Sequence, residues 1–182
     1  MNRNGRAALC VLAVAAGAFL LVFASAKARS EEKVAEVAKK APRATLQEAK
    51  GQAKLLHDTF DTSLQLVHLE YYREDEGLPI PSLIFEDVFK VVGKERDIKF
   101  HWIAVNAQPM SVDHRANDDF EKAAVKELAA GKESYEAVEG DVYRRAGAIT
   151  LFSQCLKCHV PNRTSTESRT AGLVISIPIK ND

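Results

Sequence analysis

The sequence predicts an α+β fold in which helices pack against one antiparallel sheet. Apolar residues recur at helical spacing in two long segments, whereas several shorter runs are rich in β-branched and aromatic residues. A Gly140-Asp141 pair separates two of the shorter runs, which is typical of a hairpin turn and therefore of antiparallel strands. The expected order is two helices, a strand, a helix, a hairpin, the cysteine motif and a last strand, which indicates α+β.

Three segments have the features of helices. Residues 45–72 begin with a Thr45-x-x-Glu48 capping box, and their predicted apolar face is Leu56, Phe60, Ser63, Leu64, Val67 and Tyr71. A shorter helix is expected over residues 81–92, with Gly93 as its end and with Leu83, Ile84, Val88 and Phe89 facing inward. The third predicted helix covers residues 118–130 and stops at Gly131.

Four segments are predicted to be strands. Residues 98–105 alternate in a pattern that points His101 away from the side chains beside it, and residues 135–139 and 142–149 form the hairpin. Residues 171–179 are the expected last strand. Polar loops should cover residues 106–117 and 161–170, and residues 153–159 should form a turn or a short helix.

The N-terminus has the pattern of an export segment. Arg3 and Arg6 precede an uncharged apolar run over residues 7–26 that ends in Ala24-Ser25-Ala26. This order is typical of a cleaved signal peptide, while a run of about 20 apolar residues is also long enough to remain as a membrane anchor. Both alternatives predict that the rest of the chain lies outside the cytoplasm, in the periplasm or tethered to the inner membrane.

These patterns predict three parts: residues 1–26 as signal peptide or anchor, 27–44 as a charged spacer, and 45–182 as one domain. The chain has 25 basic and 25 acidic residues, without a basic block. A nucleic-acid partner is therefore not expected.

The cysteines define the candidate site. Of three in the chain, Cys155 and Cys158 lie three positions apart and are followed at once by His159. This is the spacing of c-type haem attachment, in which both thiols bond covalently to one haem and the histidine binds its iron. The alternatives are a zinc site, a thioredoxin-like redox pair or a structural disulfide; zinc needs four ligands, and this segment offers three.

The second axial ligand is open at this stage. The candidates are His68 on the long helix, at the edge of its apolar stripe, followed by Met110 and His114 in the loop after the first strand. A methionine ligand would raise the potential relative to a second histidine, and an open position would permit binding of NO, CO or O₂. The candidate pocket residues are Tyr71, Tyr72 and Trp102.

The chain also resembles a family of exported proteins that carry a single c-type haem in a PAS-like domain. The resemblance depends on Cys155-x-x-Cys158-His159, on the segment 171–178 that follows it, and on Asp119-Phe120-Glu121 with the helical pattern through Gly131. It extends over residues 53–179. It implies a PAS-like antiparallel sheet with a long N-terminal helix and flanking helices, one haem c, and a role in redox sensing or electron transfer.

Two classes of function follow. The first is an exported haem protein for redox or ligand sensing, or for one-electron transfer, with a separate redox or signalling protein as its partner. The second is a peroxidase-type enzyme with an open distal site, in which His114 and Arg115 would supply the distal acid/base and the cation. The coordination and spin state of the iron distinguish them.

Overall fold

A four-stranded antiparallel sheet organises the domain. The computed structural model describes residues 43–107, 111–160 and 164–180. The strands are β1 (Lys99–Ala104), β2 (Ser134–Glu139), β3 (Val142–Leu151) and β4 (Arg169–Pro178), in the order β1-β4-β3-β2. The last strand of the chain therefore occupies the centre, paired with β1 on one side and β3 on the other.

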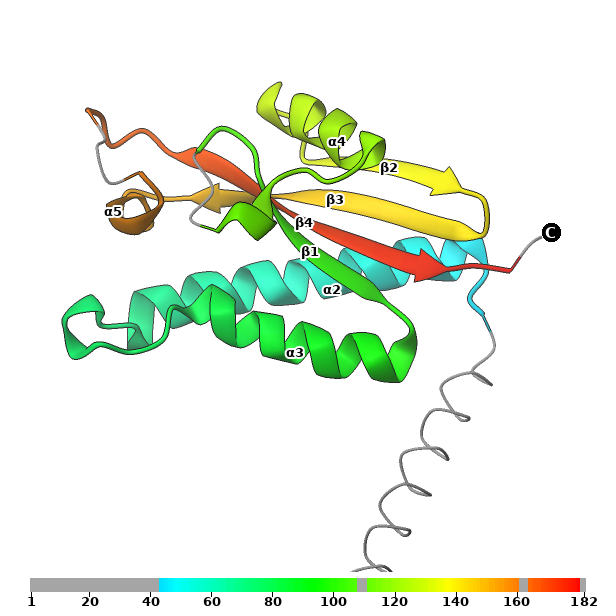
Figure 1. Ribbon diagram of the computed structural model, residues 1–182, viewed down its shortest axis with the longest axis horizontal. Coiled ribbons are helices and arrows are strands. Elements are labelled where there is room, and N and C mark those ends of the chain that lie inside the picture. The colour runs from blue at the N-terminus through cyan, green and yellow to red at the C-terminus, as the bar shows by residue number, and fades with distance from the viewer. Residues whose placement is uncertain (1–42, 108–110, 161–163, 181–182) are drawn as a thin grey trace, which may run out of the picture. The chain divides into compact units, whose positions relative to one another are not determined.

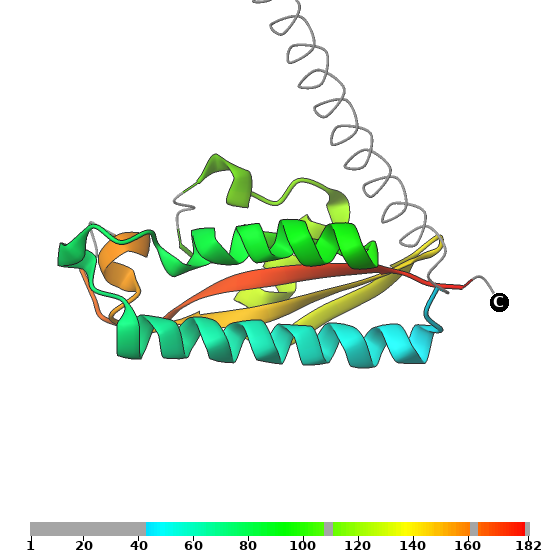
Figure 2. The same ribbon diagram turned by 90° about the horizontal axis from the view of Figure 1, so that it is seen from below.

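Helices cover both faces of this sheet (Figure 1). On one face lie α2 (Leu46–Leu66) and α3 (Pro81–Arg96), side by side (Figure 2), and on the other lies α4 (Asp119–Ala129). The short elements are the π-helical turn η1 (Val67–Tyr71), the 3₁₀ turns η2 (Glu74–Glu76) and η3 (Val112–His114), and α5 (Leu156–His159). The predicted α+β class is confirmed. No helix within the described ranges is long and apolar enough to cross a membrane.

The start of α2 agrees with the predicted capping box. The Thr45 backbone N–H donates to Glu48 Oε2 at 2.7 Å, and the Glu48 N–H donates to Thr45 Oγ1 at 3.3 Å. The end differs from the prediction. The α-helix stops at Leu66, and the chain continues as η1, in which the Tyr72 N–H donates across five residues to the Val67 carbonyl at 2.9 Å. The predicted helix to residue 72 thus contains a change of helix type near its end.

The prediction for α3 is wrong in two respects. The helix passes through Gly93 and ends at Arg96, and its C-cap Asp97 has φ 56°. Gly93 is required inside the helix because a Cβ there would lie 2.6 Å from the Ile98 carbonyl oxygen. Of the four residues predicted to face inward, Phe89 is buried, whereas Leu83, Ile84 and Val88 are among the exposed large hydrophobic residues.

The aromatic residues form the core between the sheet and the α2–α3 layer. The Phe89 ring stacks on Phe100 of β1, with centroids 4.8 Å apart, and lies 5.0 Å from Trp102. Phe60 of α2 meets Phe89 edge-on at 5.0 Å. Alternation along β1 places His101 on the opposite face, toward α4, as predicted. This packing fixes Trp102 at one end of the aromatic core.

Gly147→Ala is expected to destabilise the domain by about 2–3 kcal/mol, because added atoms in a filled core force neighbouring groups apart. A Cβ at this position of β3 would lie 2.2 Å from the ring of buried His57, on α2. Gly51→Ala, at an open position of the same helix, should instead stabilise by about 0.5–1 kcal/mol. Urea unfolding compares the two variants, and equal stability of Gly147→Ala and wild type would refute this account of the α2–β3 contact.

The predicted export segment and most of the spacer, which extends to residue 44, lie outside the described residues. Arg43 and Ala44 are described: Ala44 forms an isolated bridge with Ile179, and Arg43 forms an ion pair with Asp141. The three-part division of the chain stays a prediction.

Candidate functional site

The cysteine motif lies directly after β3. Figures 1 and 2 show α5 at the end of the sheet, next to the C-terminal end of α2. Leu156 is fully buried and packs with Leu151 and Cys155, which anchors the turn to the sheet. The Cys155 N–H donates to the Phe152 carbonyl at 2.9 Å. The predicted short helix is confirmed, and it holds Cys155 at 8% exposure against the domain.

A hollow lies beside the motif, and we call it the central hollow. It is partly open to solvent and lies against both the motif and the sheet. Its mostly apolar wall includes Leu64, Trp102, Ile103, Ile149 and Leu151. Three histidines and one cysteine also line it: His68, His114, Cys155 and His159. Residues from both halves of the chain therefore meet around one space.

A second hollow, which we call the outer hollow, adjoins the first. The two share three residues in their walls: His68, Cys155 and His159. The outer hollow is more polar, since its wall also includes Arg73, Asp75 and Lys157. Tyr72 lies here too, with its ring 5.6 Å from that of His68.

His68 is held in one orientation by its own helix. Its Nδ1 lies 2.9 Å from the Leu64 carbonyl oxygen. Because a carbonyl only accepts, Nδ1 carries the proton, and a neutral ring then has its lone pair on Nε2. A hydrogen bond of this kind, which fixes the tautomer, is typical of histidines that bind metals. His68 also lies in the π-helical turn η1, and such turns are frequent at functional sites.

His114 is the second predicted candidate that reaches the central hollow. Its Nε2 lies 3.0 Å from Glu86 Oε1 of α3, and its side chain is only 16% exposed. This nitrogen faces a carboxylate, so it is a hydrogen-bond donor and is not available to a metal. The third candidate, Met110, lies outside the described residues.

The histidine of the motif is kept neutral. Burial lowers the pKa of His159 below its ordinary value, and electrostatic interaction with nearby His68 and His114 lowers this pKa further. The neutral imidazole is the form that binds metal ions. His159 is therefore suited to act as a ligand.

Two of the three predicted pocket residues line these hollows, and one does not. Trp102 lines the central hollow and Tyr72 the outer hollow. Tyr71 lines neither and is 76% exposed, which corrects the prediction for this residue. A full turn of α-helix was expected here, and the π-helical turn η1 changes which side chains face the site.

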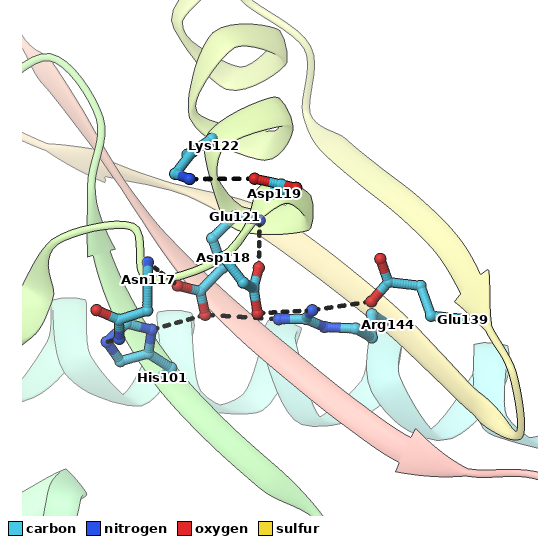
Figure 3. A network of polar contacts seen from close by, with 8 residues as sticks. All are labelled: His101, Asn117, Asp118, Asp119, Glu121, Lys122, Glu139 and Arg144. Atoms are coloured by element: carbon cyan, nitrogen blue, oxygen red, sulfur yellow. Dashed lines mark hydrogen bonds and ion pairs between the residues drawn. The ribbon is translucent and has the colours of Figure 1, made fainter.

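His101 belongs to a different polar cluster, on the α4 face of the sheet (Figure 3). Its Nδ1 lies 2.8 Å from Glu121 Oε1 and its Nε2 lies 2.6 Å from the Asp113 carbonyl oxygen. Both partners only accept, so the ring binds them best when both nitrogens carry protons. Asp118 and Arg144 also belong to the cluster, with Arg144 Nη1 2.8 Å from Asp118 Oδ2.

The pair formed by His101 and Glu121 should make stability depend on pH. The hydrogen bond to Glu121 raises the pKa of His101 above its ordinary value of 6.5. Burial raises the pKa of Glu121, but hydrogen bonds from His101 and Asn117 outweigh it, and the net pKa lies below 4.5. The stabilisation from His101 is complete below pH 6.5 and is lost as pH rises through its raised pKa. The contribution of Glu121 is lost as pH falls through its lowered pKa.

His101→Gln is therefore expected to cost about 1–2 kcal/mol near pH 5–6 and progressively less above neutrality. Urea unfolding of both proteins across this range measures the difference. A cost that stays constant or grows as pH rises would contradict the assignment of a charged His101.

Two polar residues of the site were not singled out from sequence. Glu86 binds His114, and Gln65 lines the central hollow and donates to the Thr150 carbonyl at 3.0 Å. Both are polar residues on helices, and such residues are usually expected to be exposed. Only their tertiary contacts distinguish them from ordinary surface residues.

Comparison with known proteins identifies the family. A family model described as Tll0287-like matches residues 32–173. The chain belongs to the Tll0287-like family. A similar solved structure is titled "Crystal structure of the cyanobacterial heme-protein Tll0287"; its TM-score is 0.58 at 10% sequence identity, and the match covers 76% of this chain and 99% of that chain. No curated protein matched the sequence. At this identity the likeness establishes the fold of this Tll0287-like chain.

Proposed function

We propose that this chain is an exported c-type haem protein that binds one haem covalently and acts in redox or ligand sensing, or in one-electron transfer. The single observation that carries the proposal is the convergence of His159 and His68 with Cys155 on the central hollow. The motif would supply the attachment residues and one iron ligand, His159, and η1 would supply the other, His68. Family membership and the haem protein of similar fold support the cofactor.

The residues at the hollow fit a haem. Cys155 and Cys158 would attach the haem, and His159, neutral and half-buried, would be a ligand of its iron. His68 is the preferred distal ligand because its Nδ1 is already bonded and its Nε2 is available. The apolar wall around them would exclude water from a bound haem. A bound haem would supply a one-electron iron couple, with the lower potential typical of two histidine ligands.

The fold and the N-terminal sequence also support the proposed PAS-like domain and the proposed location outside the cytoplasm. An antiparallel sheet with a long helix before it and helices on both faces is compatible with a PAS-like domain. The export pattern before residue 27 favours a periplasmic or inner-membrane-anchored location, which haem attachment through this motif requires. A redox or signalling protein is the expected partner.

The peroxidase alternative has weaker support. It would need a distal cation and acid/base beside an open iron face. Arg115 does not line the central hollow and is exposed, and His114 is engaged with Glu86. We therefore favour a haem that exchanges electrons or binds a ligand without turnover.

Expression of the full chain together with haem-attachment machinery tests the proposal. The alkaline pyridine spectrum of the purified protein should be that of a haem with two thioether bonds, at one haem per chain. A protein that carries no covalent haem under conditions in which a control c-type cytochrome is matured would refute it.

A further inference from the structure

A third hollow, which we call the α3 groove, lies between α3 and β1. Its wall includes Phe89, Phe100, Trp102 and His114. The α3 groove shares two residues with the central hollow, Trp102 and His114, and shares none with the outer hollow. The central hollow shares His68, Cys155 and His159 with the outer hollow instead. The α3 groove therefore adjoins the central hollow at Trp102 and His114, whereas the outer hollow adjoins it at the cysteine motif.

The indole N–H of Trp102, where the α3 groove adjoins the central hollow, lacks a hydrogen-bond acceptor in the described part of the chain. The residue is 8% exposed, and its indole Nε1 is buried without a hydrogen-bond partner among the described residues. Leaving a buried N–H without an acceptor is costly, and native structures rarely do so. The phenylalanines packed around the ring offer no acceptor. An acceptor is therefore expected from a molecule that enters the hollow.

His114 offers a second donor at the same place. Its Nε2 faces Glu86, so in the protonated ring the Nδ1–H remains for another acceptor. A carboxylate accepts several hydrogen bonds at once, and such charge-assisted bonds are stronger than neutral ones. The indole N–H, joined by the Nδ1–H of His114 when that ring carries both protons, therefore suits a carboxylate.

We infer that Trp102 and His114 form a carboxylate site that binds a propionate of the haem. The inference rests on the proposed function. In a c-type haem, the edge of the ring that is bonded to cysteine is opposite the edge that carries the two propionates. A haem attached at Cys155 that lies in the central hollow would carry its propionates away from the motif, toward a wall that includes Trp102 and His114. The site holds the acidic edge of the ring while the thioethers hold the other.

The test uses the holoprotein and the resonance Raman band of propionate bending, whose frequency rises when the carboxylate accepts hydrogen bonds. Trp102→Phe removes the N–H and keeps an aromatic ring, and it should lower the frequency with haem content unchanged. His114→Gln should also lower it. Val91→Ala is the control, because this residue of α3 is 59% exposed and lines none of the three hollows; its band should stay at the wild-type frequency.

Other results would overturn the inference. One is a propionate bending band in the wild-type holoprotein at the frequency of a propionate that is hydrogen-bonded only to water. This measurement requires no variant. Another is a change in the C–O stretch of bound CO in Trp102→Phe with an unchanged propionate band, which would assign the indole to the distal ligand side. Absence of covalent haem from the wild-type protein, measured by the pyridine spectrum, would instead refute the proposed function, so the two failures are distinguishable.

Discussion

Replacing both Cys155 and Cys158 by alanine is expected to reduce covalent haem to background. Each thiol supplies one of the bonds to the haem, and no other cysteine follows the predicted export segment. The measurement is the mass of the intact purified protein, together with haem staining after denaturing electrophoresis. Each single variant should give less holoprotein than wild type, with a pyridine spectrum shifted to that of a single thioether bond.

Lys157→Ala is the matched control, since this exposed residue lies between the two cysteines and supplies no attachment atom. It should mature with wild-type haem content. If the double cysteine variant retained covalent haem, or if the lysine variant lost it equally, the attachment assignment would be wrong.

His68→Ala is expected to convert essentially all of the ferric haem from low spin to high spin. The side chain supplies the second strong-field ligand in our account, and its removal leaves a weak ligand or an open position. The absorption and electron paramagnetic resonance spectra measure the change. The ferrous variant should also bind CO much faster than wild type, because no histidine must first leave the iron.

Leu69→Ala provides the control for this variant. Leu69 lies in the same π-helical turn and is 60% exposed, so its truncation alters the turn without removing a ligand. It should remain low spin. A low-spin spectrum in His68→Ala would contradict the assignment and return attention to Met110 and His114 as ligands.

The elements that local patterns describe well were predictable from sequence. The capping box at Thr45 and the hairpin at Gly140 depend on residues close together in the chain, and both are present. The inward face of α3 was not predictable in the same way. Its apolar residues cover more than one face, and the contact with Phe60 and Phe100 selects the face of Phe89. The face with Ile84 is left exposed.

The candidate site likewise contains residues that local sequence predicts and residues that only the tertiary fold brings together. Cys155, Cys158 and His159 are adjacent in sequence, and their spacing alone predicts their chemistry. The approach of His68 depends on α2 packing across β3 and β4, and the π-helical turn that carries it has no sequence signal of its own. The buried indole of Trp102 and the pairing of His114 with Glu86 likewise depend on the tertiary fold.

The central claim is that His159 and His68 bind the iron of one covalent haem from opposite sides. The absorption spectrum of the full wild-type chain, recorded in the ferric and ferrous states with and without CO, tests it most directly. We predict six-coordinate low-spin haem in both oxidation states and slow binding of CO to the ferrous form. A five-coordinate high-spin spectrum with immediate CO binding, or the absence of a haem spectrum, would contradict the claim.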